Sequence, residues 1–224
     1  MAEGIVVDPA RDGVARIVLD NADRRNALSI AVRDAVSSAL HTLGRDEAVK
    51  VVVVTGTGST FSSGFDLREF EHAAGDALFG ASLWESSDRF HRACLEFPLP
   101  LLAAVNGPAI AGGFDLAIMC DIRVAADTAR FAHPEIAFGD VVYGPLHDAI
   151  GGARARELCL TGRSVDAGEA LRIGLVSSVV PVAQLGAEVG RYTDWIVRAP
   201  RDVLMRTKAK AIRRAAVSGA TLDL

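Results

Sequence analysis

The chain has 224 residues, half of them hydrophobic, and a net charge of -4. The length suits one large domain or two small ones, and the composition is that of a globular protein with a buried core. Because no block of basic residues dominates, we do not expect nucleic-acid binding. The start lacks a signal peptide's basic residues, and no unbroken apolar stretch is long enough to span a membrane. We therefore expect a soluble, cytoplasmic protein.

The first half of the chain predicts alternating strands and helices. Arg11-Asp12-Gly13 joins two β-rich runs, which indicates a hairpin. Ser29 is a candidate helix cap. Two continuous apolar runs are too short and β-branched for helices and are typical of strands buried on both faces. The predicted elements are strands at residues 5–7 and 14–19, a helix over 30–43, a strand at 51–54, a mostly helical stretch over 66–97 and a strand at 101–105.

The second half continues the alternation and then becomes entirely helical. We predict a helix over residues 114–120, strands at 122–125 and 130–132, helices over 153–161 and 167–173, a strand at 175–180, and helices over 182–197 and 201–216. Strands alternating with helices place the chain in the α/β class. We expect a core over residues 1–181 and a helical region over residues 182–224. Cys94, Cys120 and Cys159 are widely spaced and apolar in context, as expected for core thiols rather than zinc ligands.

Two glycine-bearing turns each leave a predicted strand and enter a predicted helix. They read FSSGFDL at 61–67 and NGPAIAGGFDL at 106–116. The first N–H groups of a helix have no internal acceptor, and two converging on one point would form an oxyanion hole. A phosphate-binding loop is disfavoured, because Gly113 and Phe114 stand where Lys and Ser/Thr would be needed. From local chemistry alone, tight helix entries explain both turns equally well.

Two acidic residues lie close to these turns. Asp115 follows Gly112 by three residues, so both can face one side of the first helical turn. Glu135 follows a proline in FAHPEIAF. Taken singly, each is better explained as an ordinary acid at a helix start. Taken together, two carboxyl groups beside an anion-binding hole are suited to moving a proton on and off carbon, because a close pair need not be ionised together.

At these residues the sequence resembles the crotonase superfamily of enoyl-CoA hydratases and isomerases. The resemblance covers nearly the whole chain and rests on NADRRNALS, FSSGFDL, LLAAVNGPAIAGGFDLAIMCDIRVAA, FAHPEIAFG and LTGRSVDAGEALRIGLVSSVV. It implies a spiral of ββα units in two sheets, followed by helices that form a homotrimer or a dimer of trimers. It also implies an acyl-CoA substrate and no metal or other cofactor, since CoA arrives with the substrate.

The resemblance also assigns site residues. The oxyanion-hole amides match Phe65 and Gly112, and the two acids match Asp115 and Glu135. The positions that match CoA-binding residues are Arg25, Ser63, Asp66 and Leu67. A solvated surface arginine remains the alternative for Arg25.

Three departures from the family pattern concern the site. Asp115 stands where hydratases usually carry Glu, and FGDVVYGPLHDAIGG at 138–152 replaces a glycine-rich segment. Asp140, Tyr143 and His147 are therefore possible pocket residues or surface residues of that altered segment. The C-terminal part is short, and its Lys208 and Lys210 are expected to be solvated or to reach the CoA phosphates.

The resulting expectation is hydration or double-bond isomerisation of an enoyl-CoA through an enolate. One alternative is hydrolysis, decarboxylation or carbon–carbon cleavage of an acyl-CoA or β-diketone. Another is an oligomer that binds acyl-CoA without turnover.

Overall fold

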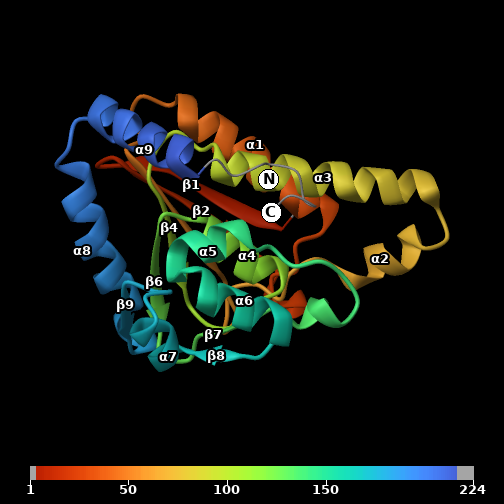
Figure 1. Cartoon of the computed structure of the whole chain (residues 1–224). Coiled ribbons are helices and arrows are strands. Elements are labelled where there is room, and N and C mark those ends of the chain that lie inside the picture. Colours follow the sequence, from red (N-terminus) through yellow and green to blue (C-terminus); the bar gives the residue numbers. More distant parts are fainter. Residues whose placement is uncertain (1–3, 216–224) are drawn as a thin grey trace.

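A six-stranded sheet with the order β1-β2-β3-β4-β6-β9 runs through the molecule (Figure 1). The structure is a computed structural model that describes residues 4–215. β1 and β2 are antiparallel, and the other neighbours are parallel. A second sheet has the order β5-β7-β8. The strands are β1 (Ile5–Arg11), β2 (Val14–Leu19), β3 (Val51–Gly56), β4 (Leu101–Val105), β5 (Ala109–Ile110), β6 (Ile122–Ala126), β7 (Arg130–Ala132), β8 (Val165–Asp166) and β9 (Ser178–Val180).

Helices connect the strands and cover the large sheet. They are α1 (Ile30–Arg45), α2 (Leu67–Ala73), α3 (Ala77–Leu95), α4 (Gly112–Met119), α5 (Gly144–Ile150), α6 (Gly152–Thr161), α7 (Ala167–Arg172), α8 (Leu185–Val197) and α9 (Arg201–Ala215), with short 3-10 turns η1 (Ala22–Arg24), η2 (Pro134–Ala137) and η3 (Val182–Gln184). The predicted α/β class is confirmed, and so is the helical C-terminal part as far as Ala215. The remainder of the region predicted over residues 182–224 lies outside the described residues. None of the helices within residues 4–215 is long and apolar enough to cross a membrane. The division at residue 181 stays a prediction.

The central strands are buried on both faces, as their continuous apolar sequences predict. Val52 and Val54 of β3 face the main core, which includes the apolar side of α1, whereas Val53 belongs to a smaller cluster with Leu185 and Val189 of α8. The α8 helix therefore covers one face of the sheet, and α1, α3 and α4 pack on the other side, where the candidate site residues lie (Figure 1).

The predicted strand over residues 175–180 is too long. The Leu175 amide donates to the carbonyl of Ala170 at 2.9 Å, and Gly174 has a φ of 79°. These residues close the C-terminal turn of α7, so the strand begins only at Ser178. The helix α5 was considered only as an alternative, a surface helix that includes His147. It begins at Gly144, and Pro145 occupies its first turn, where a missing N–H costs nothing.

The expectation for Lys208 is wrong, because its ammonium group is neither solvated nor free to bind a phosphate. Lys208 is 8% exposed, and its Nζ lies 2.6 Å and 2.5 Å from the two carboxylate oxygens of Asp121. Asp121 also accepts a hydrogen bond from the Leu101 amide at 2.8 Å. This ion pair joins α9 to the end of α4 and the start of β4.

Breaking the Lys208–Asp121 pair is expected to destabilise the protein. Removing one partner of a largely buried pair leaves the other charge uncompensated, so Lys208→Met should lower the free energy of unfolding by about 2–3 kcal/mol. Denaturant unfolding measures this change. Lys210→Met, at an exposed position of the same helix, is the matched control and should have almost no effect. Equal stabilities of the two variants would contradict the assignment.

His91 on α3 is buried as a neutral ring. It is 1% exposed, and neither ring nitrogen has a hydrogen-bond partner. Burial lowers the pKa of His91 to about 4. The charge of Asp88 raises this pKa and the charge of Arg33 lowers it, and both effects are smaller than that of burial. Because the unfolded chain takes up a proton near pH 6.5 and the folded chain does not, stability is lost as pH falls from about 6.5 to 4.

A His91→Leu variant should therefore lose part of the acid sensitivity of folding. We expect the wild-type free energy of unfolding to fall between pH 7 and pH 4 by up to about 3 kcal/mol more than that of the variant. Unfolding curves at several pH values measure this difference. His41→Leu changes an exposed histidine and serves as the control. Parallel pH dependences of His91→Leu and the wild type would count against a neutral buried His91.

Candidate active site

The two glycine-bearing turns lie against each other. A Cβ atom added to Gly112 would be 2.5 Å from Cδ1 of Phe65, and one added to Gly64 would be 2.8 Å from the carbonyl oxygen of Ile110. The Ile110 amide also donates to the Ser62 carbonyl at 3.0 Å. Only glycine permits such a close approach at positions 64 and 112. The turns that the sequence presents separately thus form one structural unit.

Side-chain hydrogen bonds fix the first turn. The hydroxyl of Ser62 donates to the Asn26 carbonyl at 2.8 Å and accepts from the Gly64 amide at 3.1 Å. The buried Asn26 side chain donates to the carbonyls of Thr57 and Thr60 at 2.9 Å and 2.8 Å. The segment around Asn26 is therefore bound to the loop that leads into Phe65.

The second turn has an unusual backbone at Ala111, with φ 51° and ψ -130°. This conformation favours glycine, so a residue with a side chain is strained there. The Ala111 amide donates to the Ala132 carbonyl at 2.9 Å, and the Ala111 carbonyl accepts from Phe114 and Asp115. The turn leaves the Gly112 amide at the start of α4. Within residues 4–215, neither the Gly112 nor the Phe65 amide has a hydrogen-bond acceptor.

Asp115 and Glu135 come together around a third side chain, His133. The Nδ1 atom of His133 lies 2.9 Å from Oε1 of Glu135 and 3.6 Å from Oδ1 of Asp115. The side chains of Asp115, His133 and Glu135 are 9%, 1% and 13% exposed. Asp115 Oδ1 and Glu135 Oε2 are buried and have no hydrogen-bond partner among residues 4–215. The two predicted acids thus have free oxygen atoms within one small cluster.

Burial determines the protonation behaviour of this cluster. It raises the pKa of Asp115 to about 7, opposed by His133 and reinforced by Glu135. Burial by itself lowers the pKa of His133, but the hydrogen bond to Glu135 and the charges of both acids outweigh it, so the net shift is upward. The nearby Cys159 thiol has its pKa raised to about 11, by burial and then by the same two acids. A carboxyl group that titrates near neutral pH can act as an acid or a base.

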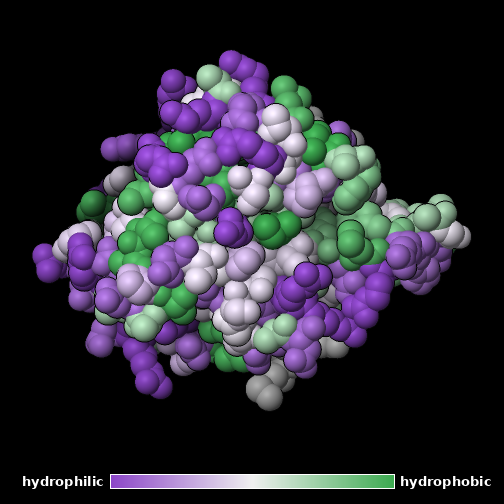
Figure 2. All heavy atoms as spheres, turned by 90° about the horizontal axis from the view of Figure 1, so that it is seen from below, coloured by the Kyte–Doolittle hydropathy of each residue, from purple (hydrophilic) through white to green (hydrophobic). Residues whose placement is uncertain are grey.

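Both acids open onto a cavity of about 520 Å³, the size of a small-molecule site. Its walls combine the two turns, the α2–α3 region and the segment after η2. The lining residues are Arg25, Ser63, Phe65, Leu67, Phe70, Trp84, His91, Ile110, Ala111, Gly112, Asp115, Pro134, Glu135, Phe138, Gly139, Asp140, Val141 and Val142. Exposed apolar residues at its edge include Leu67, Trp84 and Phe138. Figure 2 shows hydrophobic side chains gathered toward the projecting α2–α3 end of this face.

The predicted CoA-binding residues divide into two groups. Arg25, Ser63 and Leu67 line the cavity, with Arg25 and Leu67 exposed. Asp66 does not line it. Its carboxylate caps α2 by accepting from the Arg68 amide at 3.2 Å and pairs with the Arg68 side chain at 2.6 Å. The hydrogen bonds to Arg68 lower the pKa of Asp66. The structure thus gives Asp66 a helix-capping role, and a contact with CoA stays a prediction.

The altered segment over residues 138–152 contributes to the cavity through its first half. Asp140 is exposed and lines the cavity, as predicted for a possible pocket residue. Tyr143 and His147 do not line it. Tyr143 packs against the core, and His147 is an exposed residue of α5 beside Asp148. Of the two options predicted for His147, the structure therefore favours the surface position, on the helix α5.

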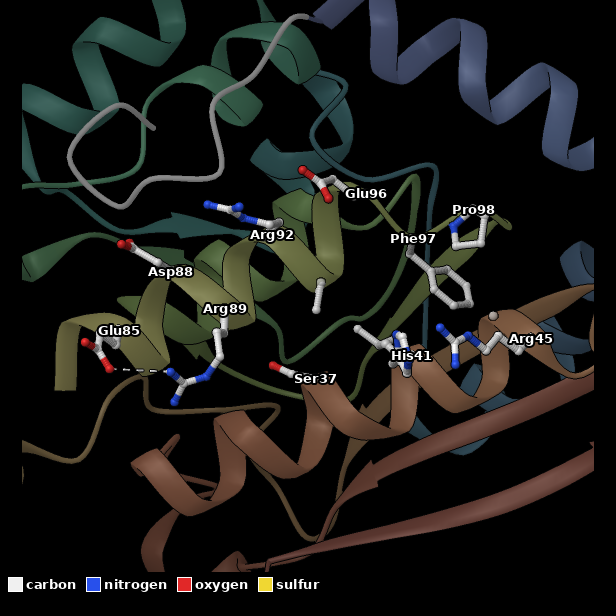
Figure 3. Close-up of a pocket in the computed structure, with 13 residues that line it drawn as sticks. Ser37, His41, Arg45, Glu85, Asp88, Arg89, Arg92, Glu96, Phe97 and Pro98 are labelled. Carbon is white, nitrogen blue, oxygen red and sulfur yellow. Dashed lines mark ion pairs between the residues drawn. The ribbon is translucent and has the colours of Figure 1, made fainter. Parts of the chain in front are cut away.

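A second cavity, of about 660 Å³, lies between α1 and α3 (Figure 3). Its walls carry side chains of both charges, such as Arg45 on α1 and Asp88 on α3, and Glu85 forms an ion pair with Arg89. Asp115, Glu135 and both glycine-bearing turns are absent from its lining. Size alone therefore does not identify the site, and the smaller cavity is the candidate.

Asp115, His133 and Glu135 are also the one set of three potential metal ligands within residues 4–215, with ligand atoms within 4.8 Å of one another. The shortest of these separations, from His133 Nδ1 to Glu135 Oε1, is a normal hydrogen-bond length. Since these two atoms can satisfy each other, we interpret the set as a hydrogen-bonded cluster. That no metal is needed stays a prediction.

Sequence reasoning missed two histidines of this region. His133 lies two positions before Glu135 in FAHPEIAF, and this proximity was the available signal. His91 gave no such signal, because it belongs to neither turn and lies in the helical stretch between them. The structure stacks its ring on Phe65, with centroids 6.2 Å apart.

Comparisons with known proteins identify the family of the chain. A family model described as enoyl-CoA hydratase/isomerase matches residues 10–222. The mouse enoyl-CoA hydratase domain-containing protein 3, named as mitochondrial, is 38% identical over 202 residues, which cover 89% of this chain and 67% of that protein. A probable enoyl-CoA hydratase of Mycobacterium bovis is 37% identical over 207 residues, which cover 90% and 78%.

Solved structures give the same result. An enoyl-CoA hydratase/isomerase from Xanthobacter autotrophicus Py2 superposes with a TM-score of 0.87 at 30% identity, covering 100% of this chain and 87% of that one. A monofunctional enoyl CoA isomerase from M. smegmatis gives a TM-score of 0.80 at 33% identity, covering 95% and 94%. By sequence and by fold, the chain belongs to the enoyl-CoA hydratase/isomerase family of the crotonase superfamily.

Proposed function

We propose that the chain is an enzyme that acts on acyl-CoA thioesters through an enolate, as a hydratase or a double-bond isomerase. The observation that supports the proposal is one cavity lined by Phe65, Gly112, Asp115 and Glu135. The amides of the first two have no acceptor within residues 4–215, and the carboxyl groups of the last two are largely buried. The amides of Phe65 and Gly112 would hold the thioester oxygen. One such donor can stabilise the developing charge by about 3 kcal/mol.

The two acids differ in environment, which suits them to different tasks. Glu135 is hydrogen-bonded to His133, whereas Asp115 Oδ1 has no hydrogen-bond partner and its pKa is raised to about 7. Glu135 would take or deliver the proton at carbon. Asp115 would orient water or act as the second proton carrier. A pair whose environments differ in this way is typical of acid/base catalysis.

Hydration and isomerisation differ in what Asp115 does. Hydration requires a water molecule held between the two acids, whereas isomerisation requires only that one proton leave one carbon and return to another. An aspartate reaches one methylene less far than the glutamate that hydratases usually carry, so it holds water at a different distance. Product analysis with 2-enoyl-CoA and 3-enoyl-CoA substrates separates the two reactions, and the same panel detects hydrolysis or decarboxylation.

The remaining parts of the proposal concern substrate binding and assembly. Arg25 is exposed at the cavity edge, where its guanidinium group suits a CoA phosphate. We propose a homotrimer or dimer of trimers that uses α8 and α9, which carry the exposed hydrophobic residues Trp195 and Val203. A cytoplasmic location also stays a prediction, since the mouse relative is named as mitochondrial.

Replacement of either acid should abolish most turnover. Glu135→Gln and Asp115→Asn keep the side-chain size but remove proton transfer, so we expect kcat/KM for enoyl-CoA substrates to fall at least about 100-fold. Asp148→Asn, at an exposed position of α5, is the control and should retain wild-type turnover. Wild-type rates of both acid variants with every accepted acyl-CoA would refute the assignment.

Removal of metal ions should leave the activity unchanged. The proposed reaction uses the amides and carboxyl groups of the chain, and His133 Nδ1 is already paired with Glu135. We expect identical kcat before and after dialysis against EDTA, measured with the same enoyl-CoA. A loss of activity that is restored by zinc or magnesium would instead support a metal bound by Asp115, His133 and Glu135.

A further inference from the structure

We infer that His133 is a positioning residue that donates its Nδ1 proton to Glu135 and, as a cation, holds that carboxylate in place to accept the substrate proton. The inference rests on the proposed function, because it assumes that Glu135 is the proton acceptor. It adds a third member to the acid pair, one that does not itself line the cavity.

Within residues 4–215, the ring of His133 has one hydrogen-bond partner, Glu135. Nδ1 lies 2.9 Å from Glu135 Oε1, and Nε2 is buried without a partner within residues 4–215. The ring also stacks on Phe114, with centroids 4.5 Å apart and planes 29° apart. This stacking fixes the ring plane, so Nδ1 is held toward the carboxylates. A neutral ring with its proton on Nε2 would direct a lone pair from Nδ1 at Glu135 Oε1, so the 2.9 Å contact disfavours this tautomer. The cation also carries a buried proton on Nε2, and the hydrogen bond to Glu135 and the charges of the two acids outweigh the cost of its burial.

The surrounding charges favour the cationic form. Asp115 on α4 and Glu135 on η2 are the titratable groups within residues 4–215 that act on His133, and both are acidic. Cys159 on α6 is the other titratable group near the acids, and its pKa of about 11 keeps it neutral. The face of an aromatic ring also attracts a cation. One positive charge therefore lies between two carboxyl groups, and it pairs more closely with Glu135 than with Asp115.

The consequence for catalysis is a division of labour. A cation at hydrogen-bond distance orients the carboxylate of Glu135 and attracts its negative charge, which suits Glu135 to the role of proton acceptor. The proton that Glu135 removes from carbon can then return to the substrate without a change in His133. Because the three groups titrate together, the midpoints observed belong to the cluster.

The first test observes the resting protein and needs no substrate. The imidazole nitrogen resonances of His133, identified by their loss in His133→Asn, are followed by NMR as a function of pH. We expect a midpoint above 6.5 in the wild type and a fall of at least about one pH unit in Glu135→Gln. The same midpoint in both proteins would overturn the inference.

The second test is the pH dependence of turnover. Asparagine can donate a hydrogen bond but carries no charge, so in His133→Asn the acid limb of kcat/KM should move up by about one to two pH units. On that limb kcat should fall about tenfold or more, while KM changes little because His133 does not touch the cavity. His41→Asn, at an exposed position of α1, should keep the wild-type profile.

The outcomes distinguish this inference from the proposed function. If Glu135→Gln loses turnover but His133→Asn keeps the wild-type pH profile, the inference fails and the function stands. If Glu135→Gln keeps full turnover, the proposed function fails, and the NMR comparison still decides whether the two side chains are coupled. Should His133→Asn not fold, His133→Gln provides a second uncharged donor, and the NMR midpoint in Glu135→Gln needs no change at His133.

Discussion

The close approach of two glycine-bearing turns is the constraint on which the rest of the site depends. Gly64 and Gly112 leave no room for a side chain between the turn that leads into α2 and the turn that leads into α4. Because the turns touch, Phe65 and Gly112 line the same cavity. The strained backbone of Ala111 lies in this contact. Its strain costs free energy, which the packing around the second turn must offset.

The electrostatics of the site follow from that packing. The start of α4 places Asp115 in the interior, and the short turn after β7 brings His133 and Glu135 to the same point. Burial would favour neutral carboxyl groups, and the buried histidine opposes this by providing a positive charge. The site therefore combines one acid whose pKa is near neutral with another that is directly hydrogen-bonded to the histidine.

Two charged side chains that were considered for CoA binding have structural roles in the protein. Asp66 caps α2, and Lys208 joins α9 to the core through Asp121. The family resemblance placed Asp66 among the CoA-binding residues, and Lys208 was expected to be solvated or to reach the CoA phosphates. In the structure these charges pair with other side chains of the protein. Among the residues within 4–215 that line the cavity, Arg25 is then the exposed side chain with a positive charge.

The sequence by itself determined the α/β class, the family and the two acids, because strand periodicity, glycine turns and family motifs are local signals. It also determined that β3 and β4 would be buried on both faces. Only the tertiary structure decided which residues meet. His91 enters the cavity wall from a distant helix, and the shape of α5 turns His147 away from it. His133 lies beside Glu135 in the sequence, but its position between two carboxyl groups depends on α4 packing against β7. Such contacts between distant segments are set by packing and burial, which a local sequence pattern does not encode.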